Sequence, residues 1–181
     1  MNIHPHRPHA QGFFLLEALL AVLIFSLGVL AMVAMGATAI NAQGDAQYRN
    51  DAATFANEIA TQIWLNVPRT QASAHTPSAT RDAAIAAALT ANFQHQPTTN
   101  STASGVPCKF SGGAATSPIV TSWVDEVVSG PHALPGATRE MQQILVDTSN
   151  AGNNMVTIIV CWRAPSDKFE RKHTLITYIN G

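Results

Sequence analysis

The chain has 181 residues, of which only 12% are charged, and a formal net charge of −1. This length favours one ordinary domain with an appended segment over two independent domains. The near-neutral charge and the lack of a basic stripe exclude the electrostatic footprint of a nucleic-acid-binding protein, so we expect no nucleic-acid partner.

A leader, residues 1–12, precedes a long apolar segment, residues 13–40. Residues 18–44 contain no Asp, Glu, Lys, Arg or His. A membrane helix needs about 20 apolar residues, whereas the apolar core of a secretory signal peptide has about 7 to 15. The segment therefore predicts a transmembrane helix, and by the positive-inside rule the leader with Arg7 stays cytoplasmic. An A-x-A pattern at residues 37–39 leaves cleavage by signal peptidase, and release of a secreted protein, as an alternative.

Residues 41–67 are predicted to continue the same helix with a different pattern. No proline occurs between Pro8 and Pro68, so one helix of about 80 Å can run from Phe13 to Asn66 at roughly 1.5 Å per residue. Apolar side chains recur here at spacings of three and four, which is typical of an amphipathic helix that packs on a soluble core. They are Tyr48, Ala52, Phe55, Ala56, Ile59, Ala60 and Ile63.

A globular region, residues 68–181, is predicted to begin with a polar loop and two short helices. The first helix is expected over residues 81–93, with Thr80 as its N-cap. An irregular connection, residues 94–117, follows because Thr, Ser, Gly and Pro dominate it. The second helix is indicated by apolar residues at spacings of three and four, namely Val120, Trp123, Val124 and Val127.

The last third of the chain has the composition of strands joined by turns. Residues 144–147, 155–162 and 173–179 are rich in β-branched and aromatic side chains. The middle run is apolar on both of its faces, so it is the predicted central strand. We expect an α+β fold in which three or four antiparallel strands pack against the amphipathic half of the helix.

One acid, Glu17, lies inside the apolar segment. A carboxylate in a membrane costs roughly 2.5 to 3.5 kcal/mol and needs a partner, unless it simply lies among the headgroups. If a protease cuts after Gly12, a new amine forms on Phe13, one helical turn before Glu17. That amine and the carboxylate can then pair within one chain or between neighbouring chains. Glu17 therefore favours a helix that assembles into a polymer.

The pattern G-F-x-x-x-E at Gly12, Phe13 and Glu17, followed by an unbroken apolar helix, resembles the class III signal of type IV pilins and pseudopilins. The resemblance implies that a prepilin peptidase cuts between Gly12 and Phe13 and methylates the new N-terminus on Phe13. It also implies an assembly role for Glu17 and the pilin-like lollipop shape, a long helix with a C-terminal antiparallel sheet.

Within this family, residues 15–36 and 46–64 are most similar to the PilV-type minor pilins. The later part is similar in layout, at Trp123, residues 133–136, residues 161–163 and His173. This implies a minor pilin that helps to prime a type IV pilus together with other minor pilins and the major pilin. A tip adhesin as partner, and support of adhesion or twitching motility, are further expectations. The precursor would be a single-pass protein of the bacterial inner membrane with a periplasmic bulk, and the mature chain would lie in the fibre or at its tip.

Two other functions remain open at this point. A minor pseudopilin of a type II secretion system, similar to GspI, would have the same N-terminal signal. A signal-anchored periplasmic interaction module would keep its leader and would not depend on Glu17. The two pilin-like functions differ in whether loss of the protein removes surface fibres or exoprotein release.

Cys108 and Cys161 are the two cysteines of the chain, and both fall in the region predicted to lie outside the cytoplasm. Disulfides persist in such compartments, so we expect a bridge between them, with two unpaired thiols as the alternative. The bridge would join the irregular connection to the central strand. The chain-entropy model gives it about 4 kcal/mol.

The remaining polar residues show no catalytic or metal-binding motif. The histidines of the leader (His4, His6 and His9) could bind a metal but would be lost on cleavage. The others (His75, His95, His132 and His173) lack the spacing of metal ligands and are expected to be ordinary surface residues. No G-x-S-x-G, P-loop or H-E-x-x-H pattern occurs. We expect neither an enzyme nor a cofactor, and an assembly role instead.

Overall fold

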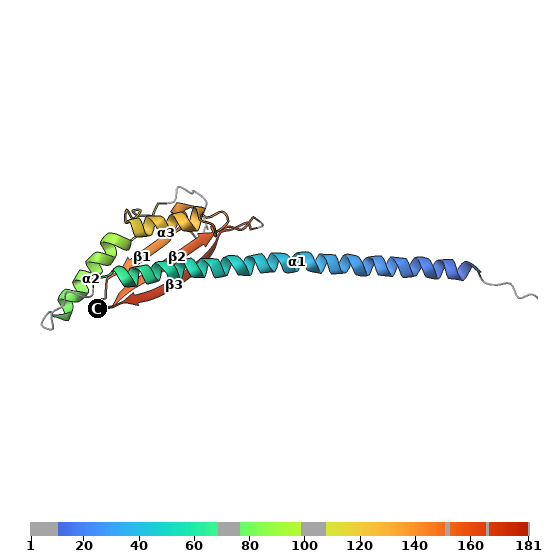
Figure 1. Ribbon diagram of the computed structural model, residues 1–181, viewed down its shortest axis with the longest axis horizontal. Coiled ribbons are helices and arrows are strands. Elements are labelled where there is room, and N and C mark those ends of the chain that lie inside the picture. Colours follow the sequence, from blue (N-terminus) through green and yellow to red (C-terminus); the bar gives the residue numbers. More distant parts are fainter. Residues whose placement is uncertain (1–10, 69–76, 99–107, 151–152, 166, 181) are drawn as a thin grey trace, which may run out of the picture. The chain divides into compact units, whose positions relative to one another are not determined.

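The computed structural model describes residues 11–68, 77–98, 108–150, 153–165 and 167–180. Its helices are α1 (Gln11–Asn66), α2 (Ser78–Phe93), α3 (Pro118–Ser129) and the short 3-10 helix η1 (Arg139–Met141), and its strands are β1 (Gln143–Asp147), β2 (Asn154–Trp162) and β3 (Arg171–Ile179) (Figure 1). The chain forms two compact units, one up to Gly44 and the other from Asp45 onward. The leader is outside the described residues except for Gln11 and Gly12.

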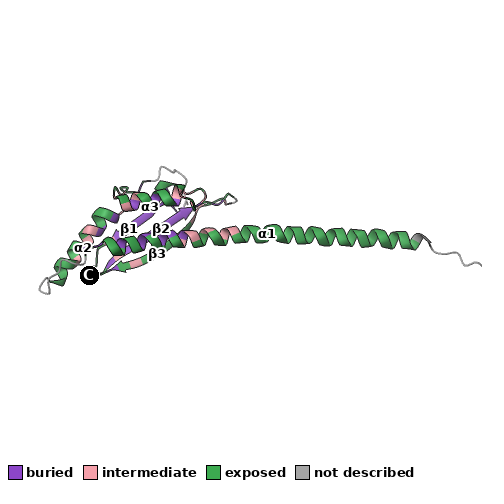
Figure 2. Ribbon diagram, viewed as in Figure 1, coloured by how far each residue is buried: buried purple, intermediate pink, exposed green. Residues whose placement is uncertain are grey.

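The second unit confirms the predicted α+β fold, because α1 from Asp45 onward packs with the sheet around one core. One stripe of α1 is buried, as its spacing of three and four predicts, whereas the other side of the helix is exposed (Figure 2). The buried stripe consists of Ala52, Phe55, Ala56, Ile59, Ala60 and Ile63, and the predicted Tyr48 is half-buried at its edge.

The sheet has three antiparallel strands in the order β1-β2-β3, which confirms the predicted central strand. Ile158 of β2 lies opposite Ile144 of β1 and Leu175 of β3. Successive side chains of β2 point to opposite faces of the sheet, and the face that points toward the core is wholly buried. The buried side chains are Val156, Ile158, Val160 and Trp162, whereas Met155, Thr157 and Ile159 on the other face are partly exposed.

Helix α3 is the second short helix expected from the sequence, and its four predicted apolar residues are all buried. Among them, the Trp123 indole Nε1–H donates to the Phe55 carbonyl oxygen at 2.9 Å, so α3 is joined to α1 by a buried hydrogen bond. This bond satisfies the one polar atom of a large buried ring. The burial of α3 therefore leaves no unpaired donor on Trp123.

Helix α2 begins one turn earlier than predicted. It starts at Ser78, so Thr80 lies inside the first turn and is not the N-cap. Pro77 precedes the helix, and its carbonyl oxygen accepts the Thr80 N–H at 3.0 Å. Pro77 is itself the N-cap residue, and the prediction gave too much weight to the hydroxyl of Thr80.

His95 was expected at the surface, and this prediction is wrong because its side chain is buried. Its N–H donates to the Ile144 carbonyl oxygen at 2.9 Å, and the Ile144 N–H donates back to the His95 carbonyl oxygen at 2.8 Å. The ring Nδ1 accepts the Ala115 N–H at 3.0 Å. The backbone at His95 thus extends the edge of the sheet beyond β1, which the irregular composition of residues 94–117 did not indicate. Of the other histidines, His132 is exposed, His173 is partly exposed and His75 lies outside the described residues.

Cys108 and Cys161 form a disulfide with a Cα–Cα distance of 6.2 Å. Together with Met141 they form a small second buried cluster, against which Phe110 and Ile159 pack. The bridge closes a loop of 53 residues, for which the chain-entropy model gives about 4 kcal/mol. It joins the segment that begins at Cys108 to the central strand, as the sequence predicts.

Candidate functional site

The first unit presents an apolar helical surface that nothing within the unit buries. Every side chain from Phe13 to Gln43 is exposed, and Phe13 itself is 78% exposed. The helix is long and apolar enough to cross a membrane. Such a surface is far larger than soluble monomers usually expose. It requires lipid or neighbouring helices around it.

The polar side chains of this segment are compatible with an apolar environment because they bond within the helix. The Ser26 hydroxyl donates to the Val22 carbonyl oxygen at 2.6 Å. The Thr38 hydroxyl donates to the Met35 carbonyl oxygen at 2.8 Å. Hydrogen bonds of this kind remove the cost of an unsatisfied donor in hydrocarbon. The hydroxyls therefore do not oppose insertion into a membrane.

Glu17 differs from these hydroxyls, since it is an acid for which the described residues provide no partner. It lies four residues after Phe13, one turn along α1, and takes part in none of the ion pairs of the described residues. Residues at this spacing are neighbours on a helix surface. Gly12 and Phe13 lie in the first turn of α1. The helix thus brings the three residues of the predicted signal together, with Glu17 unpaired among the described side chains.

Gly28 and Gly36 are open positions on the same segment. A Cβ added at either glycine would meet no atom within 4 Å. No close contact within the chain therefore requires a glycine at either position. Without a side chain, both positions leave room for a neighbouring helix to approach.

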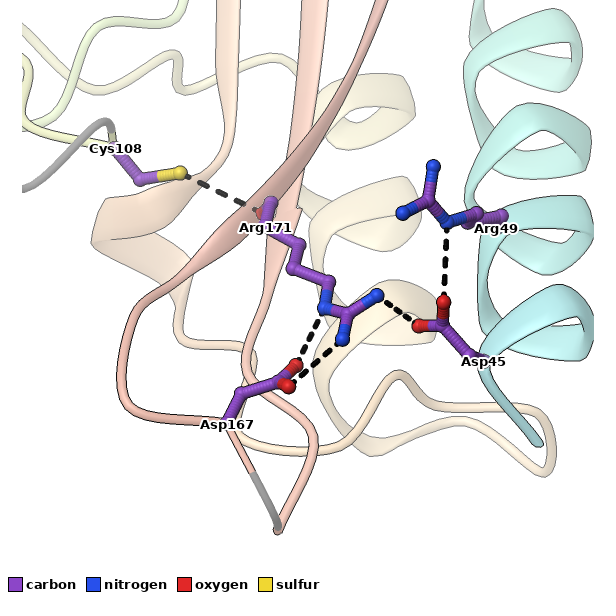
Figure 3. A network of polar contacts seen from close by, with 5 residues as sticks. All are labelled: Asp45, Arg49, Cys108, Asp167 and Arg171. Carbon is purple, nitrogen blue, oxygen red and sulfur yellow. Dashed lines mark hydrogen bonds and ion pairs between the residues drawn. The ribbon is translucent and has the colours of Figure 1, made fainter. Parts of the chain in front are cut away.

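A network of charged side chains lies at the start of the second unit (Figure 3). Arg171, the first residue of β3, donates from Nε and Nη2 to both carboxylate oxygens of Asp167, at 2.6 and 2.8 Å. Its Nη1 donates to Asp45, the first residue of the unit. The second oxygen of Asp45 lies 3.4 Å from Nε of Arg49. One guanidinium thus joins the connection between β2 and β3 to the beginning of the helical part of this unit.

The pKa values of these groups follow from their contacts. The hydrogen bonds from Arg171 hold the pKa of Asp167 below its ordinary value, and burial opposes this shift. The hydrogen bonds to Asp167 and then Asp45 raise the pKa of Arg171 further above its already high value. Asp167 and Arg171 are therefore both ionised near neutral pH.

The disulfide lies beside this network. Sγ of Cys108 is 3.8 Å from the carbonyl oxygen of Arg171 (Figure 3). A bridged sulfur has no hydrogen to donate, so this is a packing contact. The disulfide and the charged network thus fix the start of β3 from two sides.

Sequence reasoning found the bridged pair of cysteines but missed the charged network. Two of its pairs are local, because Asp45 with Arg49 and Asp167 with Arg171 are each four residues apart. This is the spacing of an ion pair on a helix, but the second pair is not helical, since Asp167 precedes β3 and Arg171 begins it. The long-range contact of Arg171 with Asp45 has no local signal. Across the described ranges, no three His, Cys, Asp or Glu side chains gather where they could hold a metal ion.

No family model, curated protein or solved structure matches this chain.

Proposed function

We propose that this chain is a minor pilin of a type IV pilus, made as a membrane precursor and incorporated into the fibre after a prepilin peptidase removes residues 1–12. The peptidase cuts between Gly12 and Phe13 and methylates Phe13. The mature chain then helps to prime the pilus in a complex with other minor pilins. Its work is assembly and involves no chemistry on a substrate.

One observation carries this proposal: an exposed apolar helix with a single unpaired acid one turn after the predicted new N-terminus. Among helices that lie side by side in a fibre, the amine of one Phe13 is a partner for Glu17 of the same or a neighbouring chain. A buried carboxylate without such a partner is strongly unfavourable. Pairing therefore favours the assembled helix over one alone in the bilayer.

The first test is the intact mass of the protein recovered from its native envelope. A mass that starts at N-methylated Phe13 supports the proposal. A start at Met1 would indicate an uncleaved anchor, and a start at Ile40 would indicate an ordinary secreted protein.

The second test separates processing from assembly. We expect Glu17→Ala to be cleaved normally but to be lost from sheared fibres, since the peptidase acts at Gly12 and the carboxylate acts later. Glu140→Ala, which removes an exposed acid of the second unit, is the matched control and should enter fibres normally. Normal incorporation of Glu17→Ala would contradict the role of Glu17. A deletion that abolishes exoprotein release but leaves surface fibres intact would indicate a pseudopilin instead.

A further inference from the structure

The connection between β2 and β3 lies close to Asp45, where the second unit begins. Arg171 donates hydrogen bonds to both Asp167 and Asp45 (Figure 3). This side chain therefore keeps the end of the connection next to α1 at Asp45. The contact of Cys108 with the backbone of Arg171 holds it from the other side. The position of the connection next to Asp45 is therefore fixed by side chains on both flanks.

Asp45 in turn lies close, along the chain, to the end of the apolar segment. Ile40 is the last large apolar residue of that segment, and five helical residues rise about 7.5 Å. The headgroup region of a bilayer is about 5 to 8 Å deep on each side of its hydrocarbon core. If α1 crosses a membrane, the residues that contact Asp45 therefore lie within reach of the headgroups, because only this short stretch of chain separates Asp45 from the apolar segment.

The side chains exposed there have the composition of a membrane-surface contact. Residues 163–172 contain four of the ten Lys and Arg residues of the chain but only two of its eleven acids. Arg171 is paired with Asp167 and Asp45, so the other charged side chains of the segment are Arg163, Lys168, Lys172 and the half-buried Glu170. Phe169 is 72% exposed, and Lys168 and Lys172 on either side of it are exposed as well. Aromatic rings favour the interface of a bilayer, and lysines there attract anionic headgroups.

We propose that Lys168, Phe169 and Lys172 form a lipid-contact site for anionic phospholipid headgroups. The ring of Phe169 enters the headgroup region, and the two ammonium groups bind phosphate oxygens on either side. The contacts of Arg171 keep these residues beside Asp45, within reach of the membrane surface while the chain is still in the bilayer. This inference rests on the membrane-spanning helix of the proposed function and on no later step of assembly.

The test uses the full-length, disulfide-bonded chain in vesicles of phosphatidylcholine and phosphatidylglycerol, prepared either with a lipid brominated near the headgroups, to report on residues 169 and 65, or with a lipid brominated near the bilayer centre, to report on residue 24. Phe169→Trp places a fluorescent ring at the site. Leu65→Trp is the matched control, because Leu65 is 74% exposed and lies twenty residues farther along α1 than Asp45. Ile24→Trp reports on the apolar segment. The unsubstituted chain supplies the background of the three native tryptophans.

We expect the added ring at residue 169 to show a blue shift and a loss of intensity by bromine quenching, and the ring at residue 65 to show neither. Lys168→Glu with Lys172→Glu should abolish the quenching at 169, as should vesicles without phosphatidylglycerol. Arg81→Glu, a charge reversal on an exposed residue of α2, should leave it unchanged.

Three results would overturn the proposal. If the rings at residues 169 and 65 are both unquenched while the ring at residue 24 is quenched, the helix is in lipid but the connection is not. No quenching at residue 24 would remove the membrane span, and the proposed function would fail with it. Quenching or a blue shift at 169 that changes with the number of chains per vesicle would indicate contact with a second chain instead of lipid.

Discussion

Gln142 offers the sharpest test of how the second unit is held together. Its side chain is fully buried beside the start of β1. The amide Nε2 donates to the carbonyl oxygens of Thr138 and Cys161, both at 3.0 Å, and Oε1 accepts the Cys161 N–H at 3.1 Å. The Gln142 amide thus bonds both the N–H and the carbonyl oxygen of Cys161, as the backbone of a neighbouring strand would.

We expect Gln142→Leu to destabilise the second unit by about 3 kcal/mol, since each lost hydrogen bond costs about 1 kcal/mol and buried backbone groups of Cys161 are left unpaired. For a unit of this size, that corresponds to a fall in Tm of roughly 10 °C. Leucine nearly conserves the volume, so the loss reports on hydrogen bonding and little on packing.

The assay is thermal unfolding of the detergent-solubilised chain, followed by near-ultraviolet circular dichroism. This signal comes from packed aromatic rings such as Trp162 and Trp123 and is insensitive to the apolar part of α1, whose helix persists in detergent. Gln62→Leu, the same substitution at an exposed position of α1, should change the stability by less than about 0.5 kcal/mol. If Gln142→Leu and Gln62→Leu have equal Tm values, the account of Gln142 is wrong.

Two further predictions concern the same unit. Burial lowers the pKa of His95 from its ordinary value, against a smaller opposing effect of the Arg139 backbone, and its Nδ1 must be unprotonated to accept the Ala115 N–H. Below about pH 6.5 the unfolded chain binds a proton at His95 that the folded chain does not. The contribution of the neutral ring to stability should therefore be fully present above this pH and should fall as the pH drops. His95→Asn should flatten the dependence of Tm on pH, and an unchanged slope would contradict the assignment. Cys108→Ser should cost about 4 kcal/mol in denaturant unfolding, and reduction of the unsubstituted chain should cause a similar loss; a much smaller loss in both would mean that the bridge adds little.

The elements that the sequence predicted well are those with a strong period. The stripe from Ala52 to Ile63 and the alternation from Val156 to Trp162 follow directly from helical and extended geometry, so both could be placed before the structure. Burial of a whole face leaves little freedom in register, since a slip of one residue would expose it.

Polar side chains that act over long distances were not predictable in this way. Gln142 pairs with Cys161, and Arg171 pairs with Asp45 across 126 residues. Nothing in the local pattern of Gln, Arg or Asp distinguishes these residues from surface ones, and their burial or pairing depends on which strands become neighbours. His95 was misplaced for the same reason, since its burial depends on pairing with Ile144.

The two compact units divide at Gly44, and they are stabilised by different means. The second unit has its own core, an interior disulfide and hydrogen-bonded polar groups such as Gln142. The first has no buried core among its described residues, and its exposed side chains are mostly apolar, so its free energy depends on the lipid or helices around it. A substitution such as Gln142→Leu should therefore lower Tm without affecting cleavage after Gly12, whereas Glu17→Ala should leave Tm unchanged and still block assembly. If Glu17→Ala loses fibres at an unchanged Tm, the defect lies in the helix. If its Tm falls as well, as expected for Gln142→Leu, the defect lies in folding.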